Sequence, residues 1–101
     1  MREEEPSRSD TDQALEREFV VKNKYGLHAR PAALFVKTAS KFTCDILVEK
    51  DGAAVSGKSI MGLLTIEGHE GSVLKVTATG LDAQDALVAL QIIFDEKFDE
   101  E

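Results

Sequence analysis

The fold of this chain is constrained most by a run with apolar residues at alternate positions, which Asp51-Gly52 joins to a second short apolar run. In "CDILVEK" the apolar residues Cys44, Ile46 and Val48 alternate with polar ones, which is typical of a strand with one buried face. Asp-Gly is a strong signal for a two-residue hairpin turn, and "AAVS" follows it directly. The sequence therefore predicts an antiparallel hairpin whose inner face covers a core.

Apolar periodicity elsewhere in the chain predicts two further strands and three helices. Strands are expected at 16–23 and 72–80, and helices at 28–42, 59–66 and 81–98. At the start of the last helix we expect Asp82 and Asp85 to form a capping box. The resulting order of elements, βαββαβα, is that of a small α+β domain.

Charge is concentrated at the two ends of the chain. Residues 1–12 carry five acids and two bases, residues 95–101 carry five acids and one base, and the part between them is neutral. A neutral domain lacks the basic stripe of a nucleic-acid-binding surface, so we expect no nucleic-acid partner. Residues 1–14 show no apolar period, and we expect a disordered acidic arm there, followed by one domain over 15–101 with an acidic tail.

The single cysteine and the distribution of apolar residues exclude further classes. Cys44 has no partner for an internal disulfide and belongs to no cysteine-rich metal motif, so we expect no metal site. No apolar run approaches the roughly 20 residues of a membrane span, and "MREEEPSRSD" is acidic where a signal peptide would be basic and then apolar. We therefore expect a cytoplasmic protein without membrane insertion.

The segment from Gly52 to Ser59, "GAAVSGKS", matches the G-x-x-x-x-G-K-[ST] pattern of a nucleotide-binding P-loop. A P-loop follows a buried parallel strand and opens a long helix, whereas here the first glycine belongs to a hairpin turn and Gly62 interrupts the helix within one turn. We interpret the match as a hairpin followed by a short helix with Ser59 as N-cap. The sequence therefore predicts no bound nucleotide or other cofactor.

The residues with the clearest chemistry lie in "GLHARPAA", residues 26–33. If His28 is a helix N-cap, Ala29, Arg30 and Pro31 form the first turn, whose backbone N–H groups have no partner within the helix. A phosphoryl group on His28 would meet the N–H groups of Ala29 and Arg30, the positive end of the helix dipole and the Arg30 guanidinium. Pro31 removes a donor at no cost to the helix but disfavours helical geometry at Arg30, so the helix is expected to start at Ala29 or one residue later. On these residues alone, a structural cap remains the alternative to a phosphoryl site.

Two motifs together resemble the HPr family, the histidine-containing phosphocarriers of the bacterial phosphoenolpyruvate-dependent sugar phosphotransferase system. They are "GLHARPAALFVKTASKF" and "GKSIMGLL", and the resemblance runs from about residue 16 to residue 98. It implies an open-faced β-sandwich, in which three helices cover one side of a four-stranded antiparallel sheet, and a monomer. It also implies that Enzyme I phosphorylates His28 on Nδ1 and that an Enzyme II A domain receives the group, with Arg30 as the stabilising cation and Pro31 shaping the turn. Such a protein is a stoichiometric carrier and no enzyme.

Ser59 has a structural and a regulatory interpretation. Its position before a short helix is that of an N-cap. The resemblance implies in addition that Ser59 matches the serine that an ATP-dependent HPr kinase phosphorylates to regulate carbon metabolism, with a transcriptional regulator as a further partner. On this view the kinase, and not this chain, binds ATP.

A docking surface is expected between the two sites. Ala33 and Lys37 follow His28 at helical spacing, while Lys58, Ile60 and Met61 flank Ser59, which predicts an apolar patch rimmed by bases. The resemblance places residues that match Ile60 and Met61 on the docking face of the family, whereas their plain interpretation is core packing. His69, in "EGHEG", is expected to be a solvated loop residue.

The acidic ends of the chain keep two other functions open. The heavy tail "FDEKFDEE" is similar to that of the nitrogen-branch phosphotransferase carriers, which serve regulation instead of sugar uptake. A co-regulator that works through phosphorylated Ser59 alone is the second alternative, although relatives of that kind lack the active histidine. The sequence does not identify the sugars or the Enzyme II partners.

Overall fold

The structure, a computed structural model, describes residues 14–100 of the 101-residue chain. Its elements are β1 (Ala14–Val20), α2 (Ala29–Ala39), β2 (Asp45–Lys50), β3 (Ala53–Ser56), α3 (Ile60–Thr65), β4 (Val73–Thr79), α4 (Ala83–Asp95) and the short 3₁₀ helix η1 (Lys97–Asp99). Apart from η1, this is the predicted order. The expected acidic arm, residues 1–14, lies outside the described residues except for Ala14, which begins β1.

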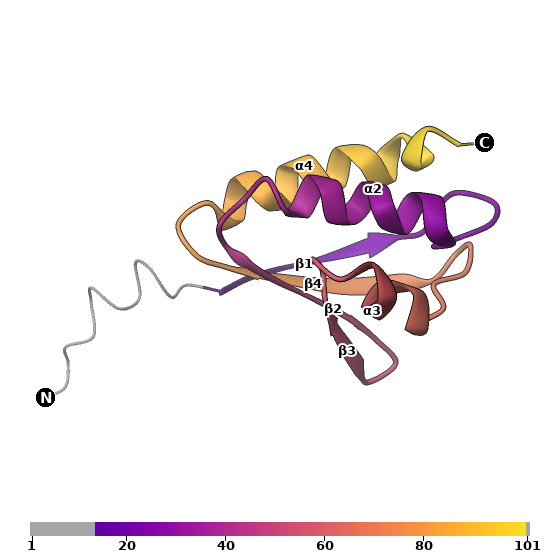
Figure 1. Ribbon diagram of the computed structural model, residues 1–101, viewed down its shortest axis with the longest axis horizontal. Coiled ribbons are helices and arrows are strands. Elements are labelled where there is room, and N and C mark those ends of the chain that lie inside the picture. Colours follow the sequence, from indigo (N-terminus) through magenta and orange to yellow (C-terminus); the bar gives the residue numbers. More distant parts are fainter. Residues whose placement is uncertain (1–13, 101) are drawn as a thin grey trace, which may run out of the picture.

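The strands form one antiparallel sheet in the order β1-β4-β2-β3. Helices α2 and α4 lie side by side over one face of it, while α3 packs against α2 and β3 (Figure 1). Among the described elements, no helix covers the opposite face. The predicted open-faced β-sandwich is therefore confirmed.

The hairpin between β2 and β3 forms at the predicted dipeptide. Asp51 has φ +52° and Gly52 has φ +87°, and two consecutive residues at positive φ are the hallmark of the turn that matches the twist of a two-residue hairpin. Val48 then pairs with Val55 and Lys50 with Ala53. This register keeps Ile46 and Val48 on the helix-covered face, where both are buried.

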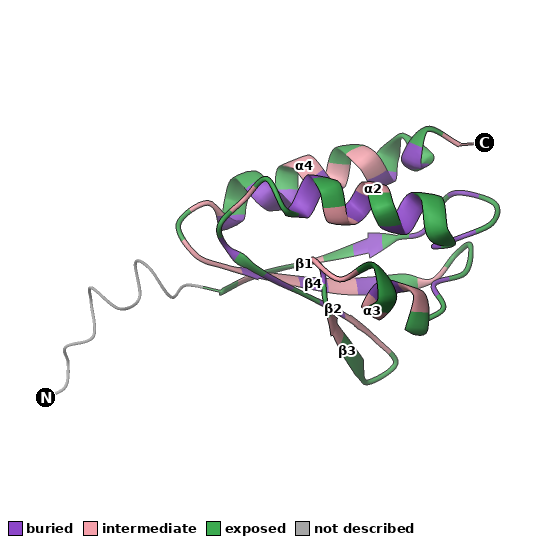
Figure 2. Cartoon of the chain, in the orientation of Figure 1, coloured by how far each residue is buried: buried purple, intermediate pink, exposed green. Residues whose placement is uncertain are grey.

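The core lies between the sheet and the two long helices, whose facing sides are buried (Figure 2). Phe94 of α4 is at its centre, with its ring stacked on Phe19 of β1 at 4.8 Å between centroids and edge-on to Phe35 of α2 at 6.1 Å. Aromatic pairs in these geometries add stabilisation beyond the burial of their surface. Phe94 therefore joins the sheet and both helices.

The prediction of a capping box at the start of α4 is wrong. Asp82 is the N-cap residue, but its side chain makes no capping hydrogen bond to its own helix. Its carboxylate instead accepts hydrogen bonds from the backbone N–H groups of Thr43, at 2.8 Å, and Cys44, at 2.9 Å. These hydrogen bonds hold the pKa of Asp82 below its ordinary value, and the one from Thr43 has the larger effect. Asp82 thus ties α4 to the segment that enters β2.

The C-terminal tail turns back across the end of α4. Lys97, Phe98 and Asp99 have φ values of +55°, +55° and +61°, a left-handed run that side-chain-bearing residues rarely adopt. Phe98 is buried and its ring contacts Phe94 at 4.9 Å between centroids. Burial of this ring anchors the turn and directs Glu100 toward the start of α2.

Candidate functional site

The loop before α2 is held by the loop before β4. The N–H of Leu27 donates to the Gly68 carbonyl oxygen at 2.8 Å, and Val21 exchanges hydrogen bonds with Ser72 and Gly71. Gly26 has φ +68°, and a side chain there would collide with the Gly68 carbonyl. These contacts leave little freedom for the residue that follows, His28.

His28 is the N-cap residue of α2, as predicted. Its backbone is extended, its carbonyl accepts the N–H of Ala32 at 3.0 Å, and its side chain makes no capping hydrogen bond, so the ring remains available for chemistry. Helix α2 begins at Ala29, so Arg30 adopts helical geometry although it precedes Pro31. Pro31 is buried, whereas Ala29 and Arg30 are exposed beside His28.

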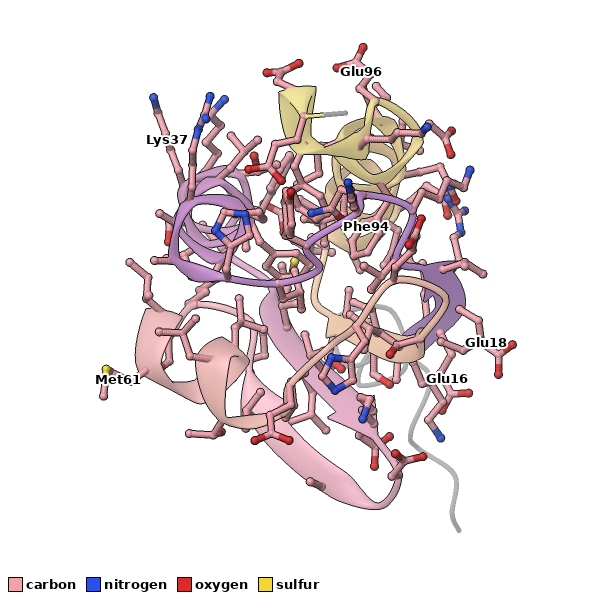
Figure 3. All side chains as sticks on the ribbon, turned by 90° about the vertical axis from the view of Figure 1, so that its right-hand side faces the viewer. Glu16, Glu18, Lys37, Met61, Phe94 and Glu96 are labelled. Atoms are coloured by element: carbon pink, nitrogen blue, oxygen red, sulfur yellow. The ribbon has the colours of Figure 1, made fainter. Side chains whose placement is uncertain are left out.

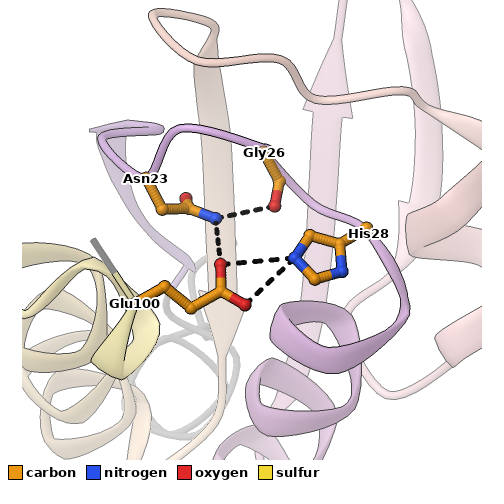
Figure 4. A network of polar contacts seen from close by, with 4 residues as sticks. All are labelled: Asn23, Gly26, His28 and Glu100. Atoms are coloured by element: carbon orange, nitrogen blue, oxygen red, sulfur yellow. Dashed lines mark hydrogen bonds and ion pairs between the residues drawn. The ribbon is translucent and has the colours of Figure 1, made fainter.

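The most important contact of His28 was not predicted. Its Nε2 lies 3.0 Å from Oε2 and 3.3 Å from Oε1 of Glu100, whose Oε1 also accepts a hydrogen bond from Asn23 Nδ2 at 3.0 Å (Figure 4). The "FDEKFDEE" tail was visible in the sequence as a charged segment only. Phe98, a single aromatic residue within this charged segment, is the one sequence signal that the segment folds back.

Aromatic and basic groups surround the imidazole. Tyr25 is exposed and stands edge-on to the His28 ring at 6.4 Å between centroids, with the Lys24 ammonium 5.4 Å from the centre of the tyrosine ring. A depression of about 340 Å³ is lined by Lys24, Tyr25, Arg30, Asp99 and Glu100. The concave surface beside His28 therefore contains the predicted cation, Arg30, and the unpredicted carboxylate of Glu100.

His69 is exposed in a loop, as predicted, but it lies close to the site. With Tyr25, Leu27, His28, Glu67 and Gly68 it lines a second depression of about 330 Å³. Its backbone N–H donates to Ser72 Oγ at 2.9 Å. The described residues contain no group of three or more His, Cys, Asp or Glu side chains arranged to hold a metal ion.

Ser59 is the N-cap of α3, as predicted. Its Oγ accepts the N–H of Gly62 at 3.0 Å, and its extended backbone marks the helix boundary. Leu63 anchors the helix in the core, while Ile60 and Met61 remain 40% and 72% exposed. The expectation that these two residues point to solvent is therefore met in the structure.

The remaining residues of the expected patch behave differently from one another. Ala33 and Lys37 are exposed on α2, and Figure 3 shows Lys37 and Met61 pointing outward on the same side of the molecule. Lys58 does not extend to the rim of this patch, because its ammonium donates to the Phe42 carbonyl oxygen at 2.7 Å. We call the surface formed by Ala33, Lys37, Ile60 and Met61 the α2–α3 patch.

The fold agrees with the comparison with known proteins. The model of the PTS-HPr family, described as the PTS HPr component phosphorylation site, matches residues 15–96. The chain belongs to the HPr family.

Relatives of this HPr family member include both phosphocarriers and HPr-like proteins. The chain is 49% identical over 83 residues to the HPr-like protein Crh of Halalkalibacterium halodurans, a match that covers 82% of this chain and 98% of the relative. It is 40% identical over 87 residues to the phosphocarrier protein HPr of Xylella fastidiosa, covering 86% and 98% of the two chains. The crystal structure of HPr-C-His from Thermoanaerobacter tengcongensis superimposes with a TM-score of 0.83 at 50% identity, covering 86% and 98%.

The P-loop pattern has a structural explanation in this HPr fold. Its first glycine, Gly52, lies in the hairpin turn, and the four residues that follow form β3, which pairs with β2. Lys58 is bound to the Phe42 carbonyl and Ser59 to the N–H of Gly62. The segment therefore has no phosphate-wrapping loop.

Within residues 14–100, no helix is long and apolar enough to cross a membrane.

Proposed function

We propose that the chain is a phosphoryl carrier that accepts a phosphoryl group on His28 from phospho-Enzyme I and passes it to Enzyme II A domains. One observation carries this proposal: the His28 ring stands at the N-terminus of α2 with Nε2 facing Glu100, so that Nδ1 points away from the carboxylate (Figure 4). A neutral imidazole nitrogen is nucleophilic, and its phosphoramidate is labile enough to be transferred. The chain is consumed and regenerated stoichiometrically and catalyses no reaction alone.

The start of α2 supplies the anion-binding groups for this role. Ala29 and Arg30 provide backbone N–H groups of the first turn, to which the helix dipole adds positive potential. The first turn contains no acidic residue that would oppose a phosphoryl group. The exposed Arg30 guanidinium is the cation proposed to stabilise the phosphoryl group, and the buried Pro31 fixes the turn.

We assign the α2–α3 patch to partner docking. It combines the exposed side chains of Ile60 and Met61 with the Lys37 ammonium, which suits partners that present apolar residues inside an acidic rim. Enzyme I and the Enzyme II A domains are the proposed partners. The chain is proposed to act as a monomer in the cytoplasm.

Ser59 is proposed as a regulatory site for HPr kinase/phosphorylase. A phosphate there would add nearly two negative charges beside Ile60 and Met61, at the start of α3. Like charge would repel acidic partners, while a transcriptional regulator with a basic groove would gain a binding group. Recovery of unmodified Ser59 after incubation with such a kinase and ATP would contradict the assignment.

A co-regulator that works through phosphorylated Ser59, with no carrier role for His28, is the second candidate, since the HPr-like protein Crh is among the close relatives. A nitrogen-branch carrier is an alternative within the carrier class. The presence of His28 with Arg30 and Pro31 favours a carrier, because a protein that works only through a serine has no use for a nucleophilic histidine at a helix start.

Replacement of the gene copy in the host cell by His28→Ala and Ser59→Ala variants tests the choice. A sugar-system carrier requires that His28→Ala abolishes uptake of phosphotransferase sugars while Ser59→Ala preserves it. If His28→Ala leaves uptake intact but loses nitrogen-dependent regulation, the nitrogen branch is correct. If only Ser59→Ala changes the phenotype, the co-regulator is correct and the carrier function is refuted.

A further inference from the structure

The chemical nature of the two partners fixes the proton on the His28 ring. A carboxylate has acceptor atoms only, so the contact of 3.0 Å between Glu100 Oε2 and His28 Nε2 requires a hydrogen on Nε2. A neutral imidazole carries one ring hydrogen, which leaves the lone pair on Nδ1. Glu100 therefore selects the ring nitrogen that is free to act as a nucleophile.

Glu100 itself is held from the opposite side. Asn23 is fully buried, and its Nδ2 donates to Glu100 Oε1 at 3.0 Å and to the Gly26 carbonyl oxygen at 2.7 Å. Both partners are acceptors, which determines the orientation of the Asn23 amide. The Glu100 side chain is only 14% exposed, compared with 43% for His28. Asn23 thus holds the Glu100 carboxylate in place, and the carboxylate in turn orients the more exposed His28 ring.

From this network we infer that Glu100 is a positioning residue for the phosphorylation of His28, which keeps the Nε2 proton on the ring throughout the carrier cycle. The inference rests on the proposed function and deepens it. A role of this kind is that of a buried acid behind a reactive imidazole, which sets tautomer and orientation without touching the transferred group. The new element is that the acid comes from the C-terminal tail and is reached through the left-handed turn at Phe98.

The two half-reactions then balance without a proton transfer. In uptake, the Nδ1 lone pair attacks phosphorus, the P–Nδ1 bond forms, and the bond from phosphorus to the donor atom breaks with its electron pair returning to the donor. The ring, which carries both the Nε2 hydrogen and the phosphoryl group, becomes cationic and faces the Glu100 carboxylate. In release, the lone pair of a ring nitrogen on the acceptor histidine of the Enzyme II A domain attacks phosphorus and a new P–N bond forms. The P–Nδ1 bond breaks, its electron pair returns to Nδ1, and the neutral ring with its Nε2 hydrogen is restored.

A purely structural role of Glu100 makes a different prediction. If the carboxylate only fastened the tail to the loop at Asn23, its removal would lower the melting temperature and leave the chemistry of His28 unchanged. A positioning role instead changes the rate of phosphoryl uptake and the signal of the Nε2 proton. Stability and transfer therefore have to be measured on the same variants.

The experiment compares the full-length protein with Glu100→Gln and Glu96→Gln. Both substitutions remove one negative charge from the tail, but Glu96 is exposed and makes no contact with His28 among the described residues. Transfer from Enzyme I is followed with phosphoenolpyruvate over a range of carrier concentrations. The Nε2–H proton is observed by NMR on protein labelled with ¹⁵N in histidine.

Loss of a charge-assisted hydrogen bond is expected to slow Glu100→Gln uptake on the order of tenfold in the maximal rate, with little change in the carrier concentration at half-maximal rate. Its Nε2–H signal should move upfield as the acceptor loses its charge, while Glu96→Gln matches the wild type in both measurements. Equal rates and equal Nε2–H signals in all three proteins would overturn the inference and leave the carrier function intact. Failure of the wild type to accept phosphate would instead refute the proposed function, and with it the role of Glu100.

Discussion

Two substitutions of Ser59, by Ala and by Asp, should rank in one order by thermal stability and in the opposite order by phosphoryl transfer. Its Oγ accepts the N–H of Gly62 at 3.0 Å and is the side-chain cap of a helix of only six residues. Loss of such a cap costs about 1 kcal/mol, so Ser59→Ala should lower the melting temperature by about 4–8 °C in a domain of this size. Ser59→Asp keeps an acceptor at the same place and adds a negative charge at the helix N-terminus, so it should melt close to the wild type.

Phosphoryl transfer should rank the same variants in reverse. The charge of Ser59→Asp lies next to Ile60 and Met61 in the α2–α3 patch and should weaken docking of acidic partners, whereas Ser59→Ala leaves the patch uncharged. The assays are thermal unfolding followed by circular dichroism and the carrier-concentration dependence of labelling by Enzyme I. If Ser59→Ala melts with the wild type, or if Ser59→Asp is labelled at lower concentrations than Ser59→Ala, the account of the cap and of the patch is wrong.

Three further variants test separate parts of the account. Burial raises the pKa of the Cys44 thiol to about 11, so the thiol ionises at lower pH in the unfolded chain than in the folded one. The free energy of unfolding should therefore fall by up to about 2–3 kcal/mol as the pH rises from about 9 to about 11, and urea unfolding of Cys44→Ala should not show this loss. Hydrogen bonds from the backbone of Thr43 and Cys44 lower the pKa of Asp82, so the carboxylate stabilises the fold above about pH 4 and this stabilisation is lost on acidification. The melting temperature of Asp82→Asn should therefore change less between about pH 3 and 6 than that of the wild type. Met61→Glu should raise the carrier concentration at half-maximal labelling by about tenfold. Its melting temperature should not change, because Met61 is 72% exposed, and unchanged labelling of this variant would show that Met61 is not part of the docking surface.

The secondary structure was predictable because local signals and tertiary packing agree. Alternation at Ile46 and Val48, the Asp51-Gly52 turn and the Ser59 cap each specify their element without reference to distant residues, and the structure forms all three. The same local reasoning failed at Asp82, where a distant partner displaced the local one. Its carboxylate bonds to the backbone of Thr43 and Cys44, about forty positions earlier in the chain, and no sequence pattern announces that pairing.

The functional site was predictable in part for the same reason. His28, Arg30 and Pro31 are adjacent in sequence, so a helix start was sufficient to bring them together. Glu100 is separated from His28 by 72 positions and reaches it through three consecutive residues at positive φ, none of them glycine. The Lys58 contact with Phe42 was missed because a lysine beside a proposed regulatory serine was expected to face partners. Its ammonium instead donates to the carbonyl of Phe42, three residues after the end of α2.

The central claim is tested most directly by intact mass after incubation with phosphoenolpyruvate, magnesium and a bacterial Enzyme I. The wild type should gain one phosphoryl group that mild acid removes, because a phosphoramidate on histidine is acid-labile whereas a phosphate on Ser59 is not. His28→Ala should gain none, while His69→Ala, which removes the exposed neighbouring imidazole, should be labelled like the wild type. An unlabelled wild type, or label that survives in His28→Ala, would contradict the account.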